Sequence, residues 1–302
     1  MESPYHRWWA IAKMTIGLGI KKKGFWFWAA LSSYWYILLI GVFYFLDTFG
    51  TGLTPDGKNP LLQMIVWKDQ FVNAFSISQI FLFILAMLIG AGTIANDNRA
   101  NALLVYLSKP CSKLDYLIGK WVGIFIPIFL ISFVPTLLFY VYGALTYAQH
   151  GFLADSFILP KLVGMSAVAG FVHASLCLGV SSLFNQGRMA GATYAGLYFF
   201  GLFFTKAMQI AYVVQYERLK REPPAIISHL YYASIDGIQI GMSKVLLQTN
   251  GSPLFPNPAR DATPTPIVPA PPAVPIILAM LAICTISLLV AWRRVRAVEV
   301  VG

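Results

Sequence analysis

The feature that most constrains this chain is a series of six apolar stretches, each long enough to cross a bilayer as a helix. The hydrocarbon core is about 30 Å thick and a helix rises 1.5 Å per residue, so a span needs about 18 or more apolar residues. Barrel strands alternate apolar and polar side chains over about ten residues, and these stretches do not. The sequence therefore predicts an all-α integral membrane protein with six transmembrane helices. They are expected at about 25–46, 71–94, 121–147, 162–184, 189–214 and 274–292.

The composition agrees with a membrane protein and argues against other classes. Apolar and aromatic residues make up 58% of the 302 residues, and only 11% are charged, against about 25% in an ordinary soluble domain. The net charge of +10 first suggests nucleic-acid binding. That function needs a solvated basic face, whereas these charges lie in short clusters between apolar runs, so no nucleic-acid partner is expected.

The basic residues orient the predicted spans, because Lys and Arg are enriched on the cytoplasmic side of a membrane. The segments before the first span, between the second and third, between the fourth and fifth, and after the sixth would share one side. They contain thirteen basic residues: Arg7, Lys13, Lys21, Lys22, Lys23, Arg99, Lys109, Lys113, Lys120, Arg188, Arg293, Arg294 and Arg296. This count predicts a protein of the plasma (inner) membrane with both termini in the cytoplasm.

Two segments flank or interrupt the transmembrane domain of residues 25–302. Residues 1–24 are interpreted as a cytoplasmic interfacial helix with Trp8 and Trp9 at headgroup depth, and with Trp9 and Ala12 on its apolar face; a hydrophobic leader to the first span is the alternative. The outer loop of residues 215–273 is helix-compatible up to about residue 248 and rich in proline after it, which predicts an extended connector there.

The sequence contains no signal for catalysis or metal binding. Its four histidines and three cysteines are scattered without ligand spacing, and no metal site is expected. It has no glycine-rich phosphate loop, because Trp121 stands where Ser or Thr would follow Gly119-Lys120. Any energy source that drives this protein is therefore expected on another chain.

A few polar or small residues lie inside the predicted spans, where polar groups are costly. Asn73, Ser76 and Gln79 form a row on the second span that either lines a conduit or joins helices. His173 could line a substrate path, although a neutral imidazole bonded to a neighbouring helix is the favoured interpretation. Gly187, Gly191 and Ala195 form a small-residue stripe that allows close helix contact, within the chain or between subunits.

The segment between the second and third spans is the most informative part of the sequence. A short polar helix with an apolar leucine face breaks at Ser108-Lys109-Pro110 and is followed by a second helix start. Alternating charge beside an apolar face suits docking to a soluble partner, and an ordinary solvated loop explains it equally well.

This segment resembles the cytoplasmic loop of the type-two ABC transporter (ABC-2) permeases. The matching residues occur in the family's order: Ile94, Asp97, Leu103, Leu107, Ser108-Lys109-Pro110, Ser112-Lys113 and Gly119-Lys120. The chain departs from the pattern with Asp97 where Glu is commoner and Asn101-Ala102 where Gly-Thr is usual. The six spans, the leading interfacial helix and the large last outer loop extend the resemblance over the whole chain.

The resemblance implies a permease subunit of an ATP-driven exporter. It would pair with a second permease chain and rest on a separate ABC ATPase subunit, which would bind ATP and Mg. Contacts with that ATPase are expected from the loop residues Asp97, Arg99, Lys109, Pro110, Lys113, Asp115 and Lys120. The alternative from another class is a non-transporting membrane anchor or assembly subunit of a membrane complex.

Overall fold

The computed structural model describes residues 7–50, 59, 62, 65–100, 112–219, 229–251 and 268–295, with the backbone alone for 212–219. Its elements are all helical over these residues. The α-helices are α1 (Arg7–Ile20), α2 (Phe25–Gly50), α4 (Trp67–Gly90), α5 (Ala95–Arg99), α7 (Lys113–Thr146), α8 (Ile158–Ser182), α9 (Gly187–Leu219), α11 (Ile235–Leu247) and α12 (Ala273–Arg294). Two short 3-10 helices, η2 (Ala148–His150) and η3 (Leu230–Ala233), complete the description.

The structure confirms the all-α membrane class, and five helices are long and apolar enough to cross a bilayer. These are α2, α4 continued through α5, α7, α8 and α12. The fifth predicted span corresponds to α9, whose 33 residues give a length of about 50 Å. It is not among the five, and the count of six spans stays a prediction.

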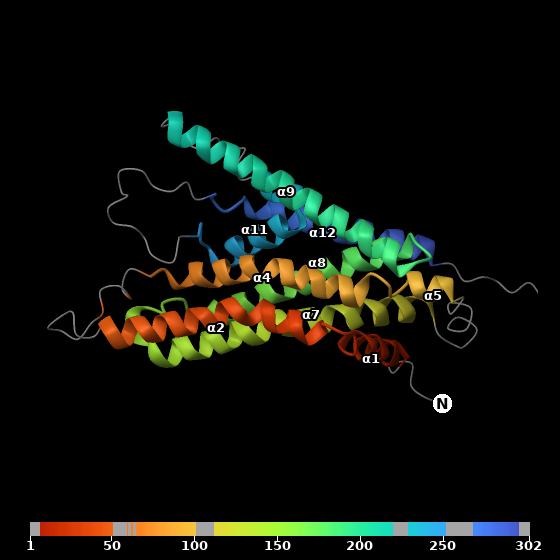
Figure 1. The fold of residues 1–302 in the computed structure, drawn as a ribbon, viewed down its shortest axis with the longest axis horizontal. Helices are drawn as coiled ribbons and strands as arrows, with labels where there is room; N and C mark the ends of the chain where they lie inside the picture. Colours follow the sequence, from red (N-terminus) through yellow and green to blue (C-terminus); the bar gives the residue numbers. More distant parts are fainter. Residues whose placement is uncertain are drawn as a thin grey trace, which may run out of the picture.

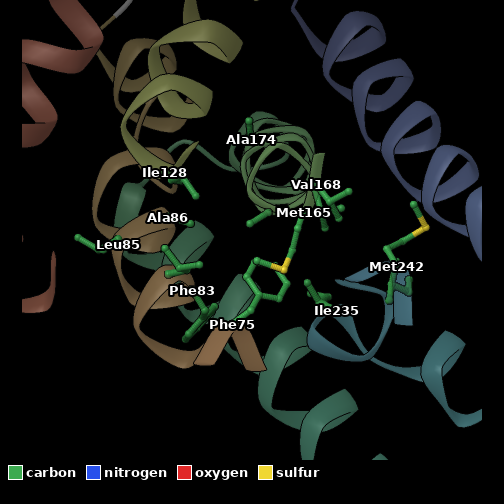
Figure 2. Close-up of a cluster of buried hydrophobic side chains, with 14 of the residues drawn as sticks. Phe75, Phe83, Leu85, Ala86, Ile128, Met165, Val168, Ala174, Ile235 and Met242 are labelled. Atoms are coloured by element: carbon green, nitrogen blue, oxygen red, sulfur yellow. The ribbon is translucent and has the colours of Figure 1, made fainter. Parts of the chain in front are cut away.

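The helices form a bundle around α8. Most of α8 is buried, including an unbroken run from Val172 to Ser182, and it packs against α4, α7, α11 and α12. Apolar side chains such as Phe75, Phe83 and Met165 fill the space between α4, α8 and α11 (Figure 2). In contrast, α12 has only three buried residues, and its exposed leucines and isoleucines suit contact with lipid.

The helix α11 shows that part of the predicted outer loop folds back onto the bundle. The Ser234 hydroxyl accepts a hydrogen bond from the Gly237 amide at 3.0 Å, which caps the helix start. The helix ends at Gln248, whose φ of 55° is the left-handed conformation common at helix ends. Between these ends α11 packs against α4, α8, α9 and α12. The sequence predicted a helix-compatible segment here within the outer loop of residues 215–273, and most residues of α11 are buried against the bundle.

The helix α1 packs on the bundle through a face that shares Ala12 with the apolar face predicted to lie at the membrane interface. Its buried residues are Ile11, Ala12, Thr15 and Gly19, whereas Trp9 is exposed. The sequence placed Trp9 with Ala12 because the weak periodicity of the segment admits more than one apolar face. The side that is buried instead meets small residues on α7, described below.

Several segments far apart in the sequence meet at one end of the bundle. Figure 1 shows α1, α5 and the turn between α8 and α9 at this end, while α9 diverges from the other helices toward the opposite end. The Lys113 ammonium lies 4.4 Å from the ring centre of Trp292, which brings the end of α12 to the start of α7. Both ends of the described chain therefore lie at this end of the bundle, which we call the junction end.

Candidate functional site

The chain leaves α4 at the junction end and turns into α5, and one serine from α8 holds this turn. The amides of Ile94 and Ala95 donate to the Ser181 hydroxyl oxygen at 3.0 and 3.1 Å. The same hydroxyl donates to the Ala91 carbonyl at 2.8 Å. All of these groups are buried. Ser181 thus satisfies three backbone groups that the turn would otherwise leave unpaired away from water.

Two asparagines of α5 attach this helix to the turn between α8 and α9. The Asn96 side-chain oxygen accepts from the Gly187 amide at 3.2 Å, and the Asn98 side chain donates to the Phe184 carbonyl at 3.3 Å. A Cβ on Gly187 would lie 3.1 Å from the Cα of Gly92, so glycine allows this close approach. As a result, α5 contacts the start of α9 as well as α8.

A buried ion pair connects α5 to α7. The Asp97 carboxylate lies 2.8 Å from the Lys120 ammonium and accepts a hydrogen bond from the Tyr116 hydroxyl at 2.8 Å. The side chain of Lys120 is 5% exposed and that of Asp97 is 17% exposed. The sequence assigned both residues to contacts with a partner ATPase, but the structure places them against each other. They join two segments of the chain, and their predicted contact with an ATPase stays a prediction.

The other predicted contact residues have different positions. Asp115 forms a capping box with Ser112 at the start of α7, Lys113 lies over the ring of Trp292, and Arg99 is exposed at the end of α5. Lys109 and Pro110 lie outside the described residues. Among the seven residues, Arg99 is therefore the described one whose charge is most open to a partner.

The helix α1 also belongs to the junction, because it packs on the same part of α7. A Cβ on Gly119 would lie 2.6 Å from the Trp8 carbonyl oxygen, and one on Gly123 would lie 2.6 Å from the Cβ of Thr15. Glycines at this spacing let two helix backbones approach closely. The junction therefore comprises α1, α5, the first turns of α7 and the turn between α8 and α9.

The polar row predicted on the second span divides between two environments. Asn73 and Ser76 line a cavity of about 280 Å³ between α4, α9, η3 and α11, together with Lys206, Asp236 and Lys244. Gln79 does not line this cavity: it is 1% exposed, and within the described part of the chain neither its side-chain oxygen nor its nitrogen has a hydrogen-bond partner.

Lys244 is the buried cation of this cavity, and α11, which bears it, is not among the five candidate spans. Its ammonium donates to the carbonyls of Asn250 and Val268 at 2.6 and 2.8 Å. Burial lowers the pKa of Lys244 to about 8, because desolvation disfavours the charged form.

His173 lies inside the bundle and does not line the cavity. Its Nδ1 lies 2.6 Å from the Tyr194 hydroxyl, and its Nε2 lies 3.3 Å from the side-chain nitrogen of Gln239. All three side chains are fully buried. The imidazole thus bridges α8, α9 and α11, which is the arrangement expected of a histidine that joins helices.

The small-residue stripe of α9 makes contacts within the chain. An added Cβ on Gly187 would meet the Asn96 side chain of α5, and one on Gly191 would meet Ala91, the residue that follows α4. Ala195 packs against the core. Of the two interpretations left open by the sequence, contact within the chain is the one that the described residues support.

Sequence reasoning missed the residues that hold the junction together. Ser181, Asn96 and Tyr116 carry side chains common in many membrane helices and loops, and their partners are 19 to 91 positions away. The one available signal was for α7, where Ser112 and Asp115 have the spacing of a capping box.

The comparisons with known proteins agree with the resemblance of the loop. Residues 9–295 match the model of the family described as ABC-2 family transporter protein. No curated protein matches the chain. Because the match covers almost the whole length and the fold is that of a helical membrane protein, the chain belongs to the ABC-2 transporter family as a membrane permease.

Proposed function

We propose that this permease is the membrane subunit of an ATP-driven exporter and that its junction end receives a separate ABC ATPase subunit. A second permease chain would complete the transporter, and ATP and Mg would be bound by the ATPase. The junction end would then face the cytoplasm, in agreement with the thirteen basic residues. The observation that carries the proposal is the Asp97–Lys120 ion pair, which joins the segment resembling a coupling loop to a transmembrane helix.

The contacts at the junction suggest how a movement of the ATPase would reach the membrane helices. Any force on α5 acts on α7 through Asp97, on α8 through Ser181 and on α9 through Asn96. Closure of an ATPase dimer would thus shift these helices together, provided that the permease has two packings of similar energy.

The test is co-purification with a candidate ABC ATPase that is co-expressed with this chain, followed by transport and ATP hydrolysis in vesicles. We expect Arg99→Glu to reduce the amount of bound ATPase about tenfold, equivalent to about 1.4 kcal/mol. The control Arg294→Glu reverses an exposed charge at the same end of the bundle but on α12, so it measures the effect of a charge reversal there without changing α5, and it should reduce binding much less. If Arg99→Glu and Arg294→Glu behave alike, the ATPase does not dock at α5.

A charge swap separates the role seen in the structure from the one expected from the sequence. Asp97→Lys with Lys120→Asp keeps an ion pair but reverses both charges. If the pair serves to join α5 to α7, the swapped protein should still bind the ATPase and couple ATP hydrolysis to transport. Loss of ATPase binding in a stably folded swapped protein would show that Asp97 contacts the ATPase directly.

A further inference from the structure

A groove of about 460 Å³ runs along the surface of the bundle between α1, α2 and α7. It begins beside the turn that joins α1 to α2, where Ile20 and Phe25 line it. It continues along α2 to Ser33, a distance of about 12 Å for eight residues. This length is close to the depth of hydrocarbon in one leaflet, which is about half of 30 Å.

The sequence explains the shape of this groove. On α2 it is floored by Ala29 and Ala30, whose side chains are single methyl groups, and on α7 by Pro127 and Pro135. The two prolines are eight residues apart, so they lie on one face of α7 about two turns from each other. Larger side chains stand at the margins, including Trp26, which is 69% exposed. The result is a depression with apolar walls.

Three consecutive lysines lie in the turn between Ile20 and Phe25, which both line the groove. Lys21, Lys22 and Lys23 form the turn between α1 and α2, and all three are exposed. Lys22 donates to the Leu88 carbonyl, which attaches the turn to α4. Within the part of the chain that the structure describes, no hydrogen bond or ion pair engages the side chain of Lys21 or Lys23. The sequence from Arg7 to Leu46 contains five basic residues and no acidic one.

We propose that this groove holds one anionic phospholipid, with an acyl chain against α2 and α7 and the phosphate between Lys21 and Lys23. The apolar floor accounts for the chain of the lipid, and the two uncommitted ammonium groups account for the negative headgroup. Trp26 lies beside the turn, at the depth where tryptophan prefers the membrane interface. Because α1 also packs on the junction, the lipid would hold α1 and α2 together next to α7.

Native mass spectrometry of the full chain tests this site. The protein is purified in detergent and mixed with equal amounts of phosphatidylglycerol and phosphatidylcholine that have the same acyl chains. We expect one phosphatidylglycerol to be retained per chain at collision energies that remove the other lipids. Equal retention of the two lipids would overturn the site.

Two variants examine the groove and the charges separately, each with a matched control. Ala30→Trp fills the groove without changing any charge, and Ala282→Trp makes the same change on the exposed face of α12. Lys21→Gln with Lys23→Gln removes two charges from the turn between α1 and α2, and Arg293→Gln with Arg294→Gln removes two charges from the end of α12. We expect both groove variants to lower phosphatidylglycerol retention about tenfold and both controls to retain it.

Lipid retention is compared only among variants that elute as single, monodisperse species. Full retention in Ala30→Trp would overturn the placement of the acyl chain. Full retention in the double lysine variant would overturn the placement of the phosphate. Lipid retention is measured without the ATPase, so its result is independent of ATPase docking.

Discussion

The junction differs from the contact between α4, α8 and α11 in whether its buried polar side chains have hydrogen-bond partners. At the junction, Ser181, Asp97 and Lys120 all have partners. On α4, α8 and α11, both side-chain polar atoms of Gln79, the Ser166 hydroxyl and one oxygen each of Asp236 and Gln239 have no hydrogen-bond partner among the described residues. An unpaired buried polar group costs about 1–3 kcal/mol.

This difference indicates which of the two regions is stabilised in a single packing of its helices. At the junction, any change of packing breaks existing hydrogen bonds, so the region is suited to move as a unit. At the α4–α8–α11 contact, a change of packing can give partners to groups that lack them. We therefore expect conformational change during transport to be concentrated at this contact.

The largest expected effect comes from breaking the ion pair on one side. Asp97→Ala leaves the Lys120 ammonium buried without its partner, which should lower the free energy of unfolding by about 3–5 kcal/mol. Arg99→Ala, an exposed position on the same short helix, should change it by less than about 0.5 kcal/mol. Thermal unfolding in detergent measures both.

The double replacement Asp97→Leu with Lys120→Met tests whether the loss of stability comes from the unpaired charge. It removes both charges and should recover most of the stability, because no unpaired buried charge remains. An Asp97→Ala variant as stable as Arg99→Ala would contradict the description of the junction.

The next effect concerns the serine that holds the turn between α4 and α5. Ser181→Ala leaves two amides and one carbonyl without that partner, so we expect a loss of about 1–3 kcal/mol in the free energy of unfolding. Its neighbour Ser182 donates to the Gly179 carbonyl of its own helix. Ser182→Ala is therefore the matched control and should be close to neutral, and equal losses in the two variants would contradict the role given to Ser181.

At the α4–α8–α11 contact we expect a substitution to raise the free energy of unfolding instead of lowering it. Gln79→Leu removes a buried amide that has no partner and should raise the free energy of unfolding by about 1 kcal/mol. If another packing uses this amide, transport should fall although stability rises. Thermal unfolding and vesicle transport of the same preparation test this, and a loss of stability would show that the amide is paired in the folded protein.

The smallest effect is a dependence on pH through Lys244. Its pKa is lowered from 10.5 to about 8 by burial, so between these values the unfolded chain binds more protons than the folded one. Stability contributed by this group should therefore rise with pH through this window, by about 1 kcal/mol between pH 8 and 9. The free energy of unfolding is measured against pH for the unmodified protein and for Lys244→Met. The rise between pH 8 and 9 should be absent from Lys244→Met, and equal slopes in the two proteins would contradict the lowered pKa of Lys244.

The sequence predicted the fold better than the site for a physical reason. Span positions depend on local hydropathy, so α2, α7, α8 and α12 were predicted within a turn or two, except that α7 begins eight residues before the predicted span. The burial of α11 depends on its packing against four other helices, and no local sequence pattern predicts that packing. In the same way, Asp97 and Lys120 were both recognised as important, but their pairing depends on how α5 returns to α7.

The difference between the two regions is tested most directly by distances measured in the assembled transporter with and without ATP. Spin labels at Arg99→Cys and Arg188→Cys report on the junction, and labels at the exposed positions Ile80→Cys and Val163→Cys report on α4 and α8. Cys111 is replaced by Ser in both. Pulsed electron paramagnetic resonance should give an unchanged distance within the junction and a shifted distance between α4 and α8. A shifted distance within the junction, with the distance between α4 and α8 unchanged, would contradict this difference between the two regions.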